Sequence, residues 1–332
     1  MAHMITPNPT TTWNASPTEF IQIYRASDDA IRAELSAGLL AAQAFTAPKY
    51  LYDELGSRLF AAICELPEYY LTRVEAGIFD EHLDEIGKST GKGSTLIDLG
   101  AGNCAKAARL FSTLQPAQYV PVDVSTDFLR NAIGLLHQRF LHIQMTGIGL
   151  DFSSALELPD AVRPEKRLFF YPGSSIGNFT PDEAVALFRR LRAACGKDGG
   201  LLVGVDLVKD KKILDAAYND ALGVTASFNL NMLLHLNKLL GADFDVREWQ
   251  HYGFFNTEHS RIEMHLEARH AVTVTWQGGQ RRFQSGERIH TENSYKYTRE
   301  SFARLLEQAG FEADGIWSDQ RSWYMLCYAH AV

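Results

Sequence analysis

The stretch that most constrains this chain is residues 95–106, TLIDLGAGNCAK. Its segment LIDL predicts a short buried strand, because it is apolar except for Asp98. Gly100 and Gly102 follow and permit a tight turn, with a close backbone approach that a Cβ atom would obstruct. Residues 105–114 predict a helix, whose first amides would then face a ligand at the turn.

A second predicted strand, YVPVD at residues 119–123, follows this helix and ends in a carboxylate. Strand, glycine turn, helix, strand and acid together are typical of a doubly wound sheet that binds a nucleoside cofactor, with Asp123 placed for the ribose hydroxyls. A glycine pair in an ordinary loop is the alternative, since Gly-x-Gly alone is weak evidence. The register of strand, helix and acid favours the cofactor site.

The composition is that of an ordinary globular protein and disfavours several partners. The 332 residues are 46% hydrophobic and 22% charged, and the net charge of −8 includes no long run of one sign. Nucleic acid and anionic membranes are therefore poor partners. The four cysteines lack metal-ligand spacing and predict buried thiols in a reducing compartment. Because no apolar run reaches membrane-spanning length and no signal-peptide core is visible, we expect a cytoplasmic protein. We also expect no metal, since the cysteines lack metal-ligand spacing.

The order of predicted elements indicates an α/β fold. Strands and helices alternate up to residue 208, where the pattern changes to a helical segment (214–240) and then to alternating strands (251–297) typical of an antiparallel sheet. A final helix (301–309) and two strands (311–318 and 322–329) would complete a seven-stranded doubly wound Rossmann-like sheet with an antiparallel last pair.

This change of pattern predicts two discontinuous domains. The cofactor domain would comprise residues 75–208 and 297–332, and a smaller α+β substrate domain would comprise residues 16–74 and 209–296. We expect the substrate between them, since seams between domains are favoured ligand sites.

The glycine turn alone does not distinguish S-adenosylmethionine from a nicotinamide cofactor, because it also satisfies the looser dinucleotide pattern with alanine at the third position. Two features favour S-adenosylmethionine. Asp98 precedes the first glycine, where a carboxylate could face the methionine ammonium, and the closing antiparallel strands match a seven-stranded methyltransferase. Asp151 and Phe152 follow the third strand and would suit adenine, with an acceptor for its amine and a ring for packing.

Five further motifs resemble one family, the S-adenosylmethionine-dependent histidine Nα-methyltransferases of ergothioneine biosynthesis. The resemblance extends from about residue 48 to the C-terminus. Its motifs, in order, are YDELGSRLF (52–60), LPEYYLTR (66–73), GSSIGNF (173–179), AYNDALGVTASFN (217–229) and TENSYKY (291–297).

The resemblance implies roles for the polar residues of these motifs. Glu292 and Ser294 correspond to the pair that grips the imidazole ring, and two residues apart on a strand they would share a face. A carboxylate and a hydroxyl can satisfy both ring nitrogens. Asn178 and Tyr218 correspond to residues that hold the amine and the carboxylate of the amino acid.

The resemblance also assigns the remaining site residues. Tyr52 and Tyr69 match pocket tyrosines, which could stabilise a methylated ammonium by cation–π contact, and Met264 would line the ring pocket. Tyr52 and Asn178 are the candidate catalytic residues. The cofactor set implied by the resemblance is Gly100, Lys106, Asp123, Asp151 and Phe152.

Without the resemblance, each of these residues has a simpler interpretation. Glu292 and Ser294 would be two polar residues on an exposed strand, and Lys106 would be a solvated surface charge. Met264 would be a core methionine. Asn178 and the tyrosines would be buried polar or packing residues.

Two departures from the family pattern bear on affinity more than on the type of reaction. Leu71 stands where proline usually follows the tyrosine pair, and Asn103 with Cys104 replaces the usual small hydroxyl residues of the turn. Fungal relatives that methylate a prenylated tryptophan share the scaffold. Retention of both Glu292 and Ser294 favours imidazole over indole, which offers one N–H donor and no acceptor nitrogen.

We therefore expect in-line transfer of the sulfonium methyl group to the neutral α-amine of histidine, with S-adenosylhomocysteine as product and the amine proton lost largely to water. Repeated transfer to the trimethylated betaine is implied by the resemblance. A methyltransferase acting on a tryptophan derivative, a nicotinamide-dependent oxidoreductase and a non-catalytic S-adenosylmethionine-binding module stay open as alternatives. The partner is a small-molecule amino acid, and the oligomeric state is open, with a monomer as one option.

Overall fold

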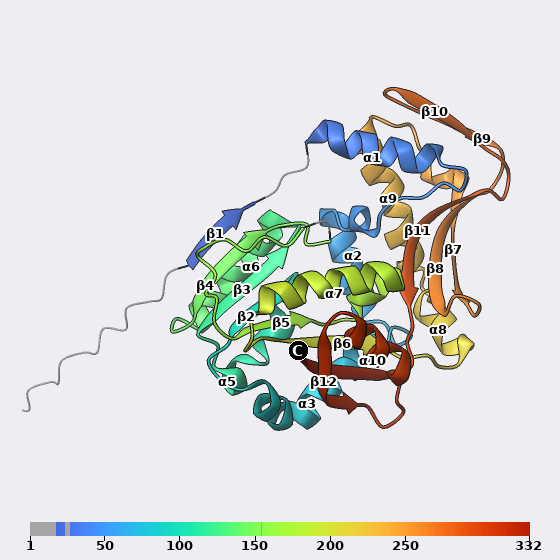
Figure 1. Ribbon diagram of the computed structural model, residues 1–332. Helices are drawn as coiled ribbons and strands as arrows, with labels where there is room; N and C mark the ends of the chain where they lie inside the picture. The colour runs from blue at the N-terminus through green and yellow to red at the C-terminus, as the bar shows by residue number, and fades with distance from the viewer. Residues whose placement is uncertain (1–17, 24–26, 154) are drawn as a thin grey trace, which may run out of the picture.

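The structure, a computed structural model, describes residues 18–23, 27–153 and 155–332. Its main feature is an eight-stranded sheet in which six parallel strands precede an antiparallel β13 (Figure 1). In spatial order the strands are β1 (Thr18–Gln22), β4 (Gln144–Gly149), β3 (Gln118–Asp123), β2 (Thr95–Leu99), β5 (Arg167–Tyr171), β6 (Gly200–Asp206), β13 (Tyr324–Ala331) and β12 (Phe311–Ser318). The order changes direction between β2 and β5, which is where such sheets bind ligands.

The predicted fold class is confirmed, and the sheet has one strand more than the seven expected. The additional strand, β1, pairs in parallel with β4 at the edge of the sheet. Its sequence, TEFIQ, has mostly exposed or half-buried side chains, so it lacks the apolar run that marks the central strands. Residues 18–22 thus lie in the main sheet, whereas we placed them in the smaller domain. The division into two domains otherwise stays a prediction.

Helices cover both faces of the main sheet because the strand side chains alternate between two apolar clusters. One face packs against α3 (Leu71–Thr90), α5 (Phe111–Leu114) and α6 (Thr126–Arg139). The other face packs against α7 (Pro181–Cys195) and α10 (Arg299–Gln308). The single helix predicted over 105–114 is wrong: α4 (Ala105–Ala108) and α5 are separated where Arg109 and Leu110 donate to carbonyls three residues back.

A second layer lies beside the main sheet (Figure 1). It contains an antiparallel three-stranded sheet and a separate two-stranded hairpin. An antiparallel sheet was predicted from the alternating strands of residues 251–297. The strands are β11 (Arg288–Tyr295), β8 (Arg261–Ala268) and β7 (Trp249–Asn256), with β9 (Val272–Trp276) and β10 (Gly279–Phe283) in the hairpin. The helices are α1 (Asp28–Leu40), α2 (Glu54–Cys64), α8 (Lys211–Ala217) and α9 (Val224–Leu240), with 3-10 helices η1 (Pro48–Leu51) and η3 (Val246–Glu248).

The single helical segment predicted over 214–240 is also wrong, and the break matters for the site. Helix α8 ends at Ala217, and α9 begins only at Val224. Asp220 caps α9 by accepting hydrogen bonds from the amides of Val224 (2.9 Å) and Thr225 (2.7 Å). Gly223 adopts a φ of +74°, which favours glycine. The loop between the helices places Tyr218 against the small sheet.

None of the helices in the described ranges is long and apolar enough to cross a membrane.

Gly204 in β6 gives room for a buried hydrogen bond that joins α3 to the main sheet. The Tyr324 hydroxyl donates to the carboxylate of Glu75 at 2.6 Å, and both groups are buried. A Cβ atom on Gly204 would overlap both the Tyr324 hydroxyl and the Glu75 carboxylate. Glycine is therefore required at this position by close packing.

We expect Gly204→Ala to lower the free energy of unfolding by about 1–3 kcal/mol, because the added methyl group overpacks this contact. Gly77→Ala is the control: it lies in α3 with nothing within 4 Å of the added Cβ atom. This change should raise stability by up to about 1 kcal/mol through helix propensity. Urea denaturation measures both, and equal stabilities for the two variants would show that the packing at Gly204 tolerates a side chain.

Candidate active site

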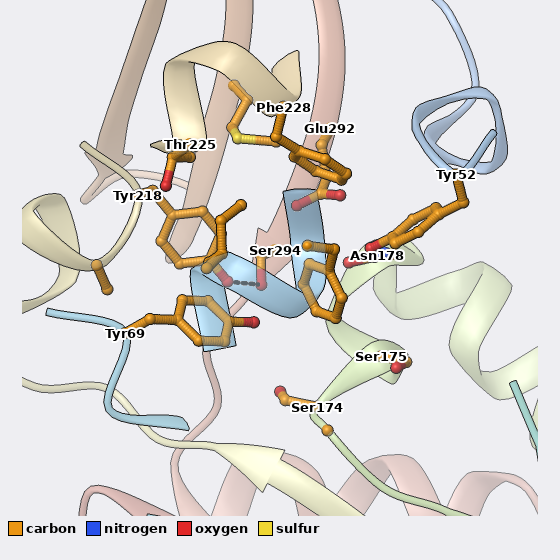
Figure 2. Close-up of a pocket in the computed structure, with 15 residues that line it drawn as sticks. Tyr52, Tyr69, Ser174, Ser175, Asn178, Tyr218, Thr225, Phe228, Glu292 and Ser294 are labelled. Atoms are coloured by element: carbon orange, nitrogen blue, oxygen red, sulfur yellow. Dashed lines mark hydrogen bonds between the residues drawn. The ribbon is translucent and has the colours of Figure 1, made fainter. Parts of the chain in front are cut away.

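One cavity lies between the main sheet and the second layer, and the structure brings all seven predicted substrate residues to its wall (Figure 2). The space within it, part of which is open to solvent, is about 490 Å³. The predicted residues are Tyr52, Tyr69, Asn178, Tyr218, Met264, Glu292 and Ser294. They come from six separate segments of the chain, so the fold and not local sequence assembles them.

The apolar side of the cavity is a cluster of aromatic rings. Tyr52 packs edge-on against Phe60 and Phe228, each with ring centroids 5.5 Å apart. Tyr69 packs against Tyr218 at 6.1 Å. Burial raises the pKa of Tyr52 and of Tyr69 well above the usual value, and Glu292 and Tyr218 add to the increase respectively. Both hydroxyls are therefore protonated at neutral pH.

Asn178 reaches the cavity because the loop after β5 packs tightly against β11. It is the last residue of the 3-10 helix η2 (Ser175–Asn178). Gly177 contacts the backbone of Tyr295, and a Cβ atom there would lie 2.8 Å from the Tyr295 carbonyl oxygen. At the start of the loop, Gly173 has a φ of +78° and donates its amide to Glu75 at 2.6 Å. The loop is thus held at both ends.

Glu292 and Ser294 face the cavity from β11 (Figure 2). The pairing of β11 with β8 shifts register between His290 and Glu292, so Glu292 pairs with Met264 and shares its face. Both Glu292 and Ser294 are buried. Burial raises the pKa of Glu292 to about 7, and the positive charge of Lys296 acts in the opposite direction.

Beneath the cavity lies a buried charged network that the sequence did not reveal. Lys296 donates to Ser294 at 2.9 Å and to Tyr218 at 3.2 Å, and its third partner is Asp206 at 2.7 Å. The same carboxylate accepts from Tyr70 at 2.8 Å and pairs with the ammonium group of Lys209. Lys296 and Tyr70 lie inside the motifs TENSYKY and LPEYYLTR, which is the only sequence signal that could have marked them.

The glycine turn lies at the carboxyl end of β2, next to the loop after β5. Gly100 and Gly102 have φ angles of +67° and +52°. Asp123, at the end of β3, accepts from the amide of Gly102 at 2.9 Å and from that of Ser125 at 2.8 Å, one with each oxygen. A carboxylate has about four acceptor sites, so each oxygen retains capacity for one ribose hydroxyl.

Asp98 is buried beside this turn. One oxygen accepts from the Tyr119 hydroxyl at 2.7 Å, and the other, Oδ1, has no hydrogen-bond partner within the described residues. Burial raises the pKa of Asp98 to about 7, although the bond from Tyr119 lowers it. An unpaired buried acceptor is costly, and the ammonium of a bound methionine moiety is a suitable partner for it.

Lys106 connects the turn to the substrate cavity. Its ammonium pairs with the buried Glu75 at 2.6 Å, and Glu75 also accepts from Gly173, which lines the cavity. Lys106 is therefore part of a defined ion pair. At the end of β4, Asp151 pairs with Lys49 at 3.5 Å, and Phe152 packs edge-on against Tyr171 at 5.7 Å.

The structure thus has two adjacent sites, the cavity and the glycine turn. A transferase that binds two substrates requires such a pair of sites. A model of the family described as "Histidine-specific methyltransferase, SAM-dependent" matches residues 31–331. The chain belongs to this family. The resemblance noted in the sequence is confirmed, and the enzyme depends on S-adenosylmethionine, which excludes the nicotinamide alternative.

Two mycobacterial relatives are similar over almost their whole length. The "Histidine N-alpha-methyltransferase" of Mycolicibacterium smegmatis is 37% identical over 306 residues, covering 89% of this chain and 94% of the relative. The protein of the same name from Mycobacterium tuberculosis is 35% identical over 298 residues, covering 88% and 92%. The "N-methyltransferase imqF" of Aspergillus flavus is 26% identical over 323 residues, covering 93% and 88%. The relatives of this chain thus include proteins whose names state histidine and one whose name states no substrate.

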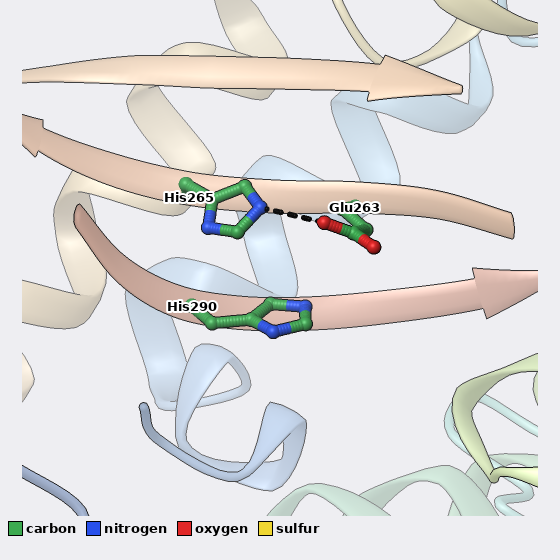
Figure 3. Close-up of side chains that lie close together, drawn as sticks. All are labelled: Glu263, His265 and His290. Atoms are coloured by element: carbon green, nitrogen blue, oxygen red, sulfur yellow. Dashed lines mark hydrogen bonds and ion pairs between the residues drawn. The ribbon is translucent and has the colours of Figure 1, made fainter. Parts of the chain in front are cut away.

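Within residues 18–23, 27–153 and 155–332, one cluster of side chains has the types that bind metals, and Figure 3 shows it. The cluster lies on the face of the three-stranded sheet opposite to Met264 and Glu292. Glu263, His265 and His290 have candidate ligand atoms within 4.8 Å of one another. The two imidazole rings stack at 4.6 Å with 27° between their planes. Glu263 already accepts from Arg261 at 2.8 Å. Stacking of the two rings and the contacts of Glu263 with Arg261 and His265 hold these side chains together.

If Asp123 receives the ribose hydroxyls, Asp123→Ala should weaken S-adenosylhomocysteine binding by about 1–3 kcal/mol, because charge-assisted hydrogen bonds are lost. Asp123→Asn keeps one acceptor oxygen and should lose less. Asp127→Ala removes an exposed acid of α6 and serves as the control. Calorimetry measures the affinities, and a folded Asp123→Ala variant with unchanged affinity would rule out the ribose assignment.

Proposed function

We propose that this methyltransferase transfers methyl groups from S-adenosylmethionine to the α-amine of L-histidine and repeats the transfer to the trimethylated betaine. The observation that carries the proposal is the pair of Glu292 and Ser294, which face one cavity from the same strand. The family description and the two mycobacterial relatives support the substrate.

The ring of histidine would bind between Glu292 and Ser294. A neutral imidazole has one N–H donor and one acceptor nitrogen. The Glu292 carboxylate can accept from the N–H group, and the Ser294 hydroxyl can donate to the other nitrogen. Met264, paired opposite Glu292 on β8, would pack against the ring.

The amino-acid end would be held by Asn178 and Tyr218, which line the same cavity. Asn178 offers a carbonyl and an amide, so it can accept from the amine and donate to the carboxylate. The faces of Tyr52 and Tyr69 would stabilise the positive charge that grows as the nitrogen is methylated. This cation–π stabilisation would favour further methylation of the same nitrogen.

The cofactor would be held by the turn at the end of β2. Asp123 would accept from the ribose, Asp151 and Phe152 would contact the adenine, and Asp98 with Lys106 would contact the methionine moiety. Gly100 would allow the close backbone approach. S-adenosylmethionine supplies an activated methyl group on its sulfonium.

The chain contributes positioning rather than a strong base. The tyrosines of the cavity have raised pKa values, so none is a phenolate at neutral pH. Tyr52 and Asn178 would act by orienting the amine for in-line attack, which lowers the entropic part of the barrier. The amine proton would pass to water before transfer.

A methyltransferase that acts on another aromatic amino acid is the second candidate, because family relatives include N-methyltransferases without histidine in their names. The buried carboxylate of Glu292 disfavours a phenyl ring, which has no N–H group to satisfy it. An indole ring has an N–H group but no acceptor nitrogen for Ser294.

The decisive test is mass spectrometry of an equimolar amino-acid mixture incubated with the enzyme and S-adenosylmethionine. We expect products with one, two and three added methyl groups on histidine alone. Methylation of tryptophan or tyrosine in preference to histidine would contradict the proposed substrate. Binding of the cofactor without any methylated amino acid would indicate a non-catalytic binding module.

A further inference from the structure

We propose that Lys296 restricts the cavity to an uncharged ring with an acceptor nitrogen, by fixing the hydrogen bonding of Ser294 and Tyr218. This inference rests on the proposed function, because it concerns how the same cavity distinguishes one form of the histidine ring from another. Lys296 follows β11 directly and its ammonium group is inaccessible to solvent. It acts on the ring through Ser294 and is thus a positioning residue.

The three protons of the Lys296 ammonium are all engaged. A protonated lysine has three donors and no acceptor. The partners are Asp206 at 2.7 Å, Ser294 at 2.9 Å and Tyr218 at 3.2 Å. No donor remains for a substrate carboxylate, so the role of Lys296 is to orient the two hydroxyl groups.

This arrangement leaves Ser294 with one remaining function. A serine hydroxyl has two acceptor lone pairs and one hydrogen. Lys296 donates to one lone pair, and the Tyr218 hydroxyl donates to the other at 2.9 Å (Figure 2). What Ser294 offers to the cavity is therefore its O–H group, which needs an acceptor. A neutral imidazole supplies that acceptor, whereas an imidazolium or an indole presents an N–H group to an oxygen without a free lone pair.

The positive charge of Lys296 acts in the same direction. Burial by itself would lower the pKa of Lys296, but Asp206 and Tyr218 raise it above the usual value, so the side chain stays charged. A second positive charge on a ring next to Ser294 is disfavoured in a buried site. The other ionisable groups facing this region are Glu292, Asp206, Lys209, Tyr52, Tyr69, Tyr70 and Tyr218.

Glu292 titrates in the same pH range as the histidine ring, so the two effects must be separated. A histidine analogue with a 1,2,4-triazole ring retains an N–H group and acceptor nitrogens but is far less basic, and it stays neutral where imidazole becomes protonated. While both rings are neutral, titration of Glu292 affects both ligands alike. The ratio of their dissociation constants therefore isolates the effect of the charge on the ring.

Lys209 provides a matched control for Lys296. Its ammonium pairs with the other oxygen of the same Asp206 carboxylate and with the Tyr70 hydroxyl. Lys209→Met thus removes one buried positive charge from the network but leaves both acceptor sites of Ser294 occupied. Tyr218→Phe is a second test variant, because it also frees one lone pair of Ser294 while retaining the ring.

The experiment is calorimetry of L-histidine and of triazolylalanine, with S-adenosylhomocysteine present, between about pH 5.5 and about pH 8, bracketing the imidazole pKa. The ratio to follow is the dissociation constant of histidine divided by that of triazolylalanine. In the wild type this ratio should rise about tenfold for each unit by which the pH falls below about 6.5, where the imidazole ring becomes charged. Lys209→Met should keep this slope, and Lys296→Met and Tyr218→Phe should flatten it.

Two results would overturn the proposal: a flat ratio in the wild type, or a full slope in both Lys296→Met and Tyr218→Phe. S-adenosylhomocysteine binding confirms that each variant is folded, and Tyr218→Phe decides the question if Lys296→Met does not fold. Failure of the proposed function is recognised separately, because the wild type would then not bind histidine even at neutral pH.

Discussion

The site depends on the ion pairs and the hydrogen bond that the buried carboxylate of Asp206 makes. It lies at the end of β6 and binds the ammonium groups of Lys209 and Lys296 together with the Tyr70 hydroxyl. These partners come from the start of α3, the segment after β6 and the end of β11, so one carboxylate joins the main sheet to the second layer. Because removing one partner of a buried ion pair leaves an uncompensated charge, the relative position of the two layers is strongly determined.

A second buried carboxylate, Glu75, joins the two ligand regions in a similar way. It accepts from Lys106 beside the glycine turn, from the amide of Gly173 at the cavity and from Tyr324 in β13. The turn and the cavity are therefore held at a fixed separation by a single side chain. For a reaction whose acceleration comes mainly from orientation, such fixed geometry is the principal contribution that the fold can make.

The sequence predicted the elements whose signals are local. The glycine turn, the buried strands and the motif residues could be recognised because each depends on a short pattern. The break at Tyr218 was missed because apolar periodicity continues across it, and β1 was missed because edge strands lack an apolar run. The pairing of Asp206 with Lys296 is not predictable from local pattern, since the two residues meet only after the layers pack. That the seven substrate residues line one cavity was likewise not predictable from local pattern, because only the folded chain brings them together.

The central claim is that Glu292 and Ser294 together select the imidazole ring, and competition binding on Glu292→Ala tests it most directly. Loss of the carboxylate should cost about 2–4 kcal/mol of histidine affinity, because a charge-assisted hydrogen bond is lost and a buried N–H group is left unpaired. Preference for histidine over tryptophan and phenylalanine should fall with it, while S-adenosylhomocysteine binding should be unchanged. A folded variant that retained its full preference for histidine would show that the ring is recognised elsewhere and would contradict the account.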